Sequence, residues 1–183
     1  EFDEYIEQQG DLLLYVYGRR NGMGTTLNDT PSANRLHIGV FGKTNSGKSS
    51  FINAFTGQEV SIVADVAGTT TDPVYKAMEI HPLGPCTIID TAGFDDESVL
   101  GGKRVERAKQ AADKTDLAVI VFAADEGTAD LQEELKWYQF FKEKHTPVLL
   151  VINKTDLADP KPLYDFLKNK TGEEALLVST RTG

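Results

Sequence analysis

Residues 42–49 read Gly-Lys-Thr-Asn-Ser-Gly-Lys-Ser, which is a complete G-x-x-x-x-G-K-[ST] motif. The apolar run 36–41 before the motif is typical of a strand, and a helical pattern begins at Ser49. A strand, a glycine-containing loop and a helix in this order place backbone N–H groups and a helix N-terminus around a phosphate. The motif therefore indicates an α/β fold that binds a phosphate-containing ligand.

The residue types in this loop suit a nucleotide with a bound divalent cation. Gly42 and Gly47 let the backbone wrap around an anion, and Lys48 reaches the β- and γ-phosphates. The Ser49 hydroxyl is a ligand for Mg²⁺. The loop residues that we expect to bind nucleotide are Gly42, Asn45, Ser46, Gly47, Lys48, Ser49 and Ser50.

A second motif, Asn153-Lys154-Thr155-Asp156, follows a buried-type strand far downstream. The Asp156 carboxylate can accept two hydrogen bonds from guanine, whereas adenine lacks those donors and would leave it unpaired. We expect Asn153 to tie this loop to the phosphate loop and the Lys154 stem to lie over the base. Near the end, Ser179 and Thr180 follow an apolar run and are expected to contact the base.

Two further elements lie between these motifs. The strand-like segment 86–90 ends in Asp90, which would hold a Mg²⁺-bound water, and the Gly93 N–H would contact the γ-phosphate. Thr70 is our choice for the second protein ligand of Mg²⁺, with Thr69 left open as the alternative. The residues assigned to catalysis are Lys48, Thr70 and Gly93.

With these elements in this order, residues 36–183 resemble the translation-factor-like GTPases. The resemblance implies a P-loop NTPase fold of the α/β class: a three-layer αβα, Ras-like GTPase domain with a mixed, mostly parallel six-stranded sheet. It also implies hydrolysis of GTP to GDP and phosphate. Small signalling GTPases carry a water-orienting Gln where this chain has Phe94, so we expect a low intrinsic rate. Which carboxylate, if any, orients the water is left open among Asp95, Asp96 and Glu97.

Finer details resemble the tRNA-modification GTPase subgroup. These are Asn45 in the phosphate loop and the segment 63–70 before the Mg²⁺ threonine. The resemblance implies that the Asn45 side chain holds a potassium ion together with the backbone carbonyls of Ala64 and Val66. Mg²⁺ and K⁺ are therefore the expected cofactors.

Two segments, 27–35 and 70–79, are similar to the HydF family, GTPases that help to mature FeFe-hydrogenase. Other members of the subgroup usually have Arg-Asp where this chain has Thr71-Asp72. The similarity implies a GTP-dependent switch domain whose partners are other hydrogenase-maturation proteins or the rest of its own chain. The alternative is the GTPase domain of a tRNA-modification or ribosome-assembly protein.

Composition limits the classes of partner and compartment. One cysteine, Cys86, cannot supply the ligands of an iron–sulfur cluster, so we expect no cluster in this chain. A net charge of −9 argues against nucleic-acid and anionic-membrane partners. No apolar run is long enough for a membrane span, and a single cysteine suits a reducing, cytoplasmic environment.

Residues 27–183 are expected to form the GTP-binding domain without its final helix, and residues 1–26 an N-terminal extension of uncertain origin. Segments 57–73 and 94–102 are polar and suit the two switch loops, which should depend on the γ-phosphate for their order. Trp137 is expected to pack in the core. The oligomeric state is left open, with a dimer among the options.

Overall fold

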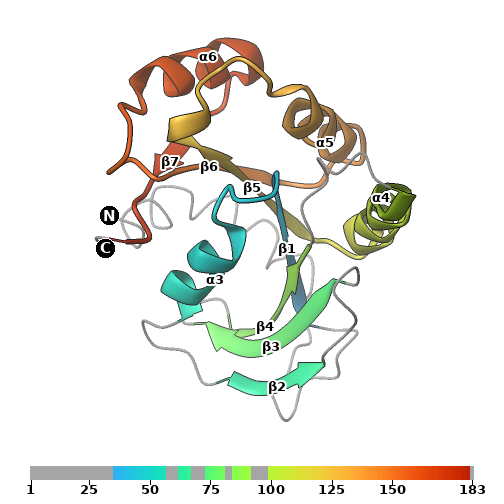
Figure 1. Cartoon of the computed structure of the whole chain (residues 1–183). Helices are drawn as coiled ribbons and strands as arrows, with labels where there is room; N and C mark the ends of the chain where they lie inside the picture. Colours follow the sequence, from blue (N-terminus) through green and yellow to red (C-terminus); the bar gives the residue numbers. More distant parts are fainter. Residues whose placement is uncertain (1–34, 57–61, 67–72, 81–83, 92–98, 182–183) are drawn as a thin grey trace.

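A computed structural model describes residues 35–56, 62–66, 73–80, 84–91 and 99–181 (Figure 1). Strands and helices alternate along most of this part of the chain. The elements in chain order are β1 (Leu36–Phe41), α3 (Lys48–Thr56), β2 (Ile62–Val66), β3 (Val74–Ile80), β4 (Gly84–Asp90), α4 (Val99–Asp113), β5 (Leu117–Ala123), η2 (Ala124–Glu126), α5 (Gln132–Glu143), β6 (Val148–Asn153), α6 (Lys161–Thr171) and β7 (Ala175–Leu177).

The strands form one mixed sheet in the order β2-β3-β4-β1-β5-β6-β7. Neighbouring strands from β4 to β7 in this order pair in parallel, whereas β3 pairs antiparallel with both β2 and β4. Helical crossovers connect most of the parallel strands, as parallel pairing requires. The predicted α/β class with a mostly parallel sheet is confirmed.

The sheet has seven strands in the described part of the chain, where we expected six. The additional strand is β2, which lies inside the segment 57–73 that we expected to be a loop. Its residues are rich in β-branched types and pair with β3 from Ile62 opposite Met78 to Val66 opposite Tyr75. The predicted loop is therefore corrected for residues 62–66, while the rest of that segment before Pro73 lies outside the described residues.

Helices cover both faces of the sheet (Figure 1). Successive side chains of a strand point to opposite faces, and β5 shows this directly. Val119 and Val121 join a core cluster with Phe51 of α3. Ile120 and Phe122 join the second cluster, which contains residues of α4, α5 and α6. The three-layer arrangement expected from the resemblance is present.

Trp137 and Cys86 both belong to the core. Trp137 is buried and stacks on Phe41, with ring centroids 5.1 Å apart, as predicted. Cys86 is fully buried, and burial raises the pKa of its thiol to about 12. A thiol in this environment packs as a small apolar side chain.

The helix bounds differ from the expectation in one place. Helix α4 begins at Val99, so residues 99–102 are helical rather than part of the second switch loop. Residues 92–98 of that loop and the extension 1–26 lie outside the described residues. Among the helices that the structure describes, none has the length and apolar character needed to cross a membrane.

Candidate guanine-nucleotide site

The site lies at the carboxyl ends of the parallel strands, where open α/β sheets bind their ligands. The phosphate loop follows β1, Asp90 ends β4, Asn153 ends β6, and Ser179 follows β7. Four segments that are distant in the sequence therefore meet at the carboxyl ends of these strands.

The phosphate loop has the conformation that its glycines allow. Gly47 has φ 92° and Asn45 has φ 63°, both in the left-handed region. A Cβ atom on Gly47 would lie 2.1 Å from Asn153 Nδ2. Glycine at position 47 is thus required by backbone conformation and by close contact with a second loop. Helix α3 begins at Lys48, so its N-terminus faces the loop.

The Lys48 side chain is buried and rests on the carbonyl groups of its own loop. Its Nζ donates hydrogen bonds to Gly42 O at 2.9 Å and to Lys43 O at 2.6 Å. An ammonium group held inside the loop in this way is close to where the loop would surround a phosphate.

Ser49 and Asp90 form an oxygen pair beside the loop. Ser49 Oγ donates a hydrogen bond to Asp90 Oδ2 at 3.2 Å. Burial raises the pKa of the Asp90 carboxyl, and the hydrogen bond from Ser49 and the charges of Lys48 and Lys76 oppose this rise. A hydroxyl and one carboxylate fit Mg²⁺, which binds through few protein oxygens together with nucleotide phosphates and waters.

Asn153 connects the base loop to two other loops. Its Nδ2 donates a hydrogen bond to Ser46 O at 3.3 Å, and its Oδ1 accepts one from Thr180 N at 3.3 Å. Asn153 is 1% exposed, so both of its polar atoms are used inside the protein. The predicted connection between the base loop and the phosphate loop is present.

The Asp156 carboxylate is held by two residues of the last loop. Oδ1 accepts a hydrogen bond from Ser179 Oγ at 2.8 Å, and Oδ2 lies 3.3 Å from Arg181 Nε. Lys154, with φ 62°, places its Nζ 3.1 Å from the Asp125 carboxylate. Asp125 and Arg181 were not predicted, because a single acidic or basic residue in a polar loop carries no distinctive sequence pattern.

The remaining predicted residues lie in the phosphate loop and α3, in β2, or outside the described residues. Asn45 and Ser50 lie in the phosphate loop and the first turn of α3, where both are exposed. Ala64 and Val66 belong to β2 at the edge of the sheet and pair with β3. The other predicted positions lie outside the described residues: Thr69, Thr70, Gly93, Phe94, Asp95, Asp96 and Glu97.

Within the described residues, no group of three or more His, Cys, Asp or Glu side chains could hold a metal ion. The Ser49–Asp90 pair falls below that number. A cation there would take its remaining ligands from nucleotide and water, which is how Mg²⁺ is held in phosphoryl-transfer sites.

Comparison with known proteins agrees with this geometry. The family model described as 50S ribosome-binding GTPase matches residues 37–154. GTPase Der of Sulfurimonas denitrificans is 34% identical over 134 residues, covering 72% of this chain and 26% of that protein. The tRNA modification GTPase MnmE of Trichormus variabilis is 36% identical over 139 residues, covering 74% of this chain and 29% of that protein.

A solved structure is similar in both fold and sequence. The crystal structure of an Era variant of Aquifex aeolicus bound to GDP.AlF4- has a TM-score of 0.64 and 32% identity, covering 80% of this chain and 52% of that chain. The chain therefore spans about half of this structure and between 26% and 29% of the two curated relatives.

Proposed function

The chain belongs to the 50S ribosome-binding GTPase family, and from this premise we propose that it is the nucleotide-dependent switch of a larger protein in tRNA modification or ribosome assembly. As a GTPase domain of this class it binds GTP and hydrolyses it to GDP and phosphate. Because the chain spans less than a third of the two curated relatives, Der and MnmE, the effector function would belong to other parts of the protein.

The observation that carries the nucleotide assignment is the position of Asn153 between the phosphate loop and the last loop. It connects the residues proposed to hold phosphate with Asp156, the residue proposed to read guanine. This contact holds the phosphate loop and the base loop in a fixed relative position through a buried side chain. This arrangement supports binding of one guanine nucleotide across all three loops.

In the proposed site, Lys48 and the N-terminus of α3 stabilise negative charge on the phosphates during hydrolysis. Ser49 would be a ligand of Mg²⁺ and Asp90 would hold a Mg²⁺-bound water; when bound, the ion supplies further positive charge at the nucleotide. Phe94 has no group that can orient a water molecule, so we propose slow intrinsic turnover. Asn45 would offer its side-chain oxygen to K⁺, with Ala64 and Val66 contributing backbone carbonyls.

The switch proposal is tested with the full-length protein loaded with GDP or with a non-hydrolysable GTP analogue. We expect purified ribosomal subunits or tRNA to bind one nucleotide state more tightly than the other, measured by sedimentation and by titration. The chain has a net charge of −9, so these RNA contacts should come from regions outside this domain. Equal binding of both RNA ligands in the two nucleotide states would contradict the proposal.

A second candidate is a switch domain in hydrogenase maturation. The observation in its favour is the similarity of segments 27–35 and 70–79 to HydF proteins, including Thr71 in place of the usual Arg. Its partners would be other maturation proteins, and a dimer is compatible with it. The test is activation of an apo-hydrogenase in an extract that lacks the maturation GTPase. Restored hydrogenase activity would favour this candidate, and an RNA-binding domain in the complete protein would favour the first.

A further inference from the structure

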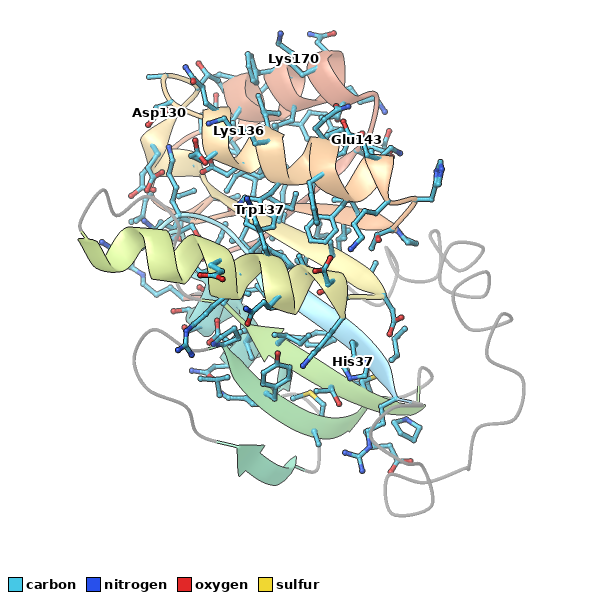
Figure 2. All side chains as sticks on the ribbon, turned by 90° about the vertical axis from the view of Figure 1, so that its right-hand side faces the viewer. His37, Asp130, Lys136, Trp137, Glu143 and Lys170 are labelled. Atoms are coloured by element: carbon cyan, nitrogen blue, oxygen red, sulfur yellow. The ribbon has the colours of Figure 1, made fainter. Side chains whose placement is uncertain are left out.

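Lys43 lies in the phosphate loop, and its side chain reaches Asp130 and the first turn of α5. It is buried, with 8% of the residue exposed. Its Nζ donates a hydrogen bond to the backbone carbonyl of Asp130 and lies 3.2 Å from Asp130 Oδ2. The same Nζ lies 3.8 Å from Glu134 Oε2, in the first turn of α5. Figure 2 shows Asp130 beside the beginning of this helix.

Glu134 is the buried member of this cluster. It is 1% exposed, and Oε2 has no hydrogen-bond partner within the described residues. Burial raises the pKa of the Glu134 carboxyl to about 7, while Lys43 acts in the opposite direction. Asp130, by contrast, is largely exposed at its side chain. Lys43 therefore lowers the cost of burying the ionised Glu134 without cancelling it.

The backbone of Lys43 is in direct contact with the phosphate-binding lysine. Lys43 O accepts hydrogen bonds from Lys48 Nζ at 2.6 Å and from Ser46 N at 3.3 Å. Two residues earlier, Phe41 stacks on Trp137, one turn beyond Glu134 in α5. The loop is thus fixed to α5 by the contact of Lys43 with Glu134 and by a ring contact.

We propose that Lys43 and Glu134 are positioning residues for phosphate binding: their contact anchors the loop to α5 and so fixes the carbonyl group that supports the Lys48 ammonium. The proposal rests on the role of Lys48 as the phosphate ligand in the GTPase site. The Lys43 side chain is engaged with Asp130 and Glu134. Lys43 acts through its own backbone carbonyl, while its side chain supplies the anchor.

The sequence alone does not single out this pair. Lys43 occupies a variable position of the G-x-x-x-x-G-K-[ST] motif, and Glu134 looks like an ordinary acidic residue in the first turn of a helix. Burial and the distance between the two charges, both visible only in the folded chain, distinguish them from surface residues.

The experiment uses the whole chain and separates stability from nucleotide affinity. At about pH 8, where the Glu134 carboxyl is ionised, Lys43→Met leaves Glu134 without its partner and should lower the urea midpoint of the nucleotide-free protein. The double variant Lys43→Met/Glu134→Gln removes both charges, so its urea midpoint should return close to wild type. If the pair positions the loop, Lys43→Met should bind GTP about tenfold more weakly than wild type, as expected for a misplaced binding group. The double variant should show the same weaker binding although its stability is restored.

Three further proteins complete the test. Lys43→Arg keeps the charge and should keep GTP affinity close to wild type. Lys168→Met breaks an exposed Lys168–Glu174 pair of 2.9 Å and should change neither quantity. Recovery of wild-type GTP affinity in the double variant would overturn the positioning role, because lower stability alone would then account for the weaker GTP binding of Lys43→Met. Lys48→Ala serves as the separate control: tight GTP binding by that variant would refute the phosphate site itself.

Discussion

Asn153 Nδ2 donates a hydrogen bond to the backbone carbonyl of Ser46, 3.3 Å away, and so joins the base loop to the phosphate loop. Both residues are buried, with 1% exposure each. A buried amide that loses its partner carries the full cost of desolvation. The contact therefore makes the two halves of the nucleotide site depend on one another.

Replacing Asn153 with Ala should weaken binding of GTP and GDP by a similar factor. The change removes bonds to Ser46 O and Thr180 N, and the loss of a buried hydrogen bond costs about 1–3 kcal/mol, or roughly 5- to 150-fold in affinity. Titration calorimetry with each nucleotide measures the effect. Asn169→Ala, on the exposed face of α6, is the matched control. A loss confined to GTP would show that Asn153 acts at the γ-phosphate instead.

Gly47→Ala should disrupt the contact between Asn153 and the phosphate loop and so weaken GTP binding. Its new Cβ would lie 2.1 Å from Asn153 Nδ2, at a backbone φ of 92°. Gly172 offers a matched position, because its φ is also positive and a Cβ added there would meet nothing within 4 Å. Gly172→Ala should cost only the conformational strain, about 1–2 kcal/mol of stability, without loss of GTP affinity. Equal effects of the two changes on GTP binding would contradict the close-contact argument.

Asp156→Asn should exchange guanine specificity for xanthine specificity. The carboxylate accepts hydrogen bonds, whereas the new amide can donate one to the C2 carbonyl of xanthine. Ser179 Oγ already fixes one carboxylate oxygen at 2.8 Å, so the side chain is held in place for this reading. Competition of XTP, GTP and ATP for the wild-type and variant proteins measures the change. Effective competition by ATP at the wild-type site would refute the assignment of Asp156.

The sequence was sufficient to predict the GTPase family and the contact between the phosphate loop and the base loop, because each loop is a short contiguous motif whose chemistry needs those residue types. It was also sufficient for the layers of the fold, since the alternation of Val119 to Phe122 in β5 is visible in the chain itself. The sequence did not predict strand β2 at residues 62–66, because the surrounding residues are polar and typical of a loop, whereas the strand is stabilised by pairing with β3. It could not find Lys43, because only the fold shows which charge faces it.

Glu134 should make the domain less stable as the pH rises. Burial raises the pKa of its carboxyl from an ordinary 4.5 to about 7; Lys43 opposes the rise, and Glu126 and Asp130 reinforce it. Between these two values the folded state keeps a proton that the unfolded state has lost. Its stabilising contribution is therefore complete below about pH 4.5 and is lost as the pH rises through 7, by on the order of 3 kcal/mol.

Urea unfolding of the nucleotide-free protein between pH 5 and about pH 8 measures this effect. The free energy of unfolding of wild type should fall relative to that of Glu134→Gln across the interval, since the amide does not titrate. Glu133→Gln removes an exposed neighbour in the same helix turn and should follow the wild-type curve. Parallel curves for wild type and Glu134→Gln would show that Glu134 does not titrate in this range.

Potassium should stimulate GTP hydrolysis more than sodium does. Phe94 cannot orient a water, and a monovalent cation near the phosphates would add positive charge that stabilises the transition state. Asn45 is exposed in the phosphate loop with φ 63°, so its side-chain oxygen is accessible to an ion. Ala64 and Val66 lie in β2 on the sheet edge, so their carbonyl groups would have to move towards the loop to complete a cage.

A cage of oxygen atoms distinguishes ions by size and by the number of ligands, so a site formed for K⁺ would bind the smaller Na⁺ poorly. The measurement is GTP turnover of wild type and Asn45→Ala in equimolar KCl and NaCl. We expect the wild type to be faster in KCl and the variant to show no preference between the two salts. If instead Asn45 only stabilises the loop backbone, its replacement should slow turnover equally in both salts. Equal wild-type rates in KCl and NaCl would exclude a functional potassium site.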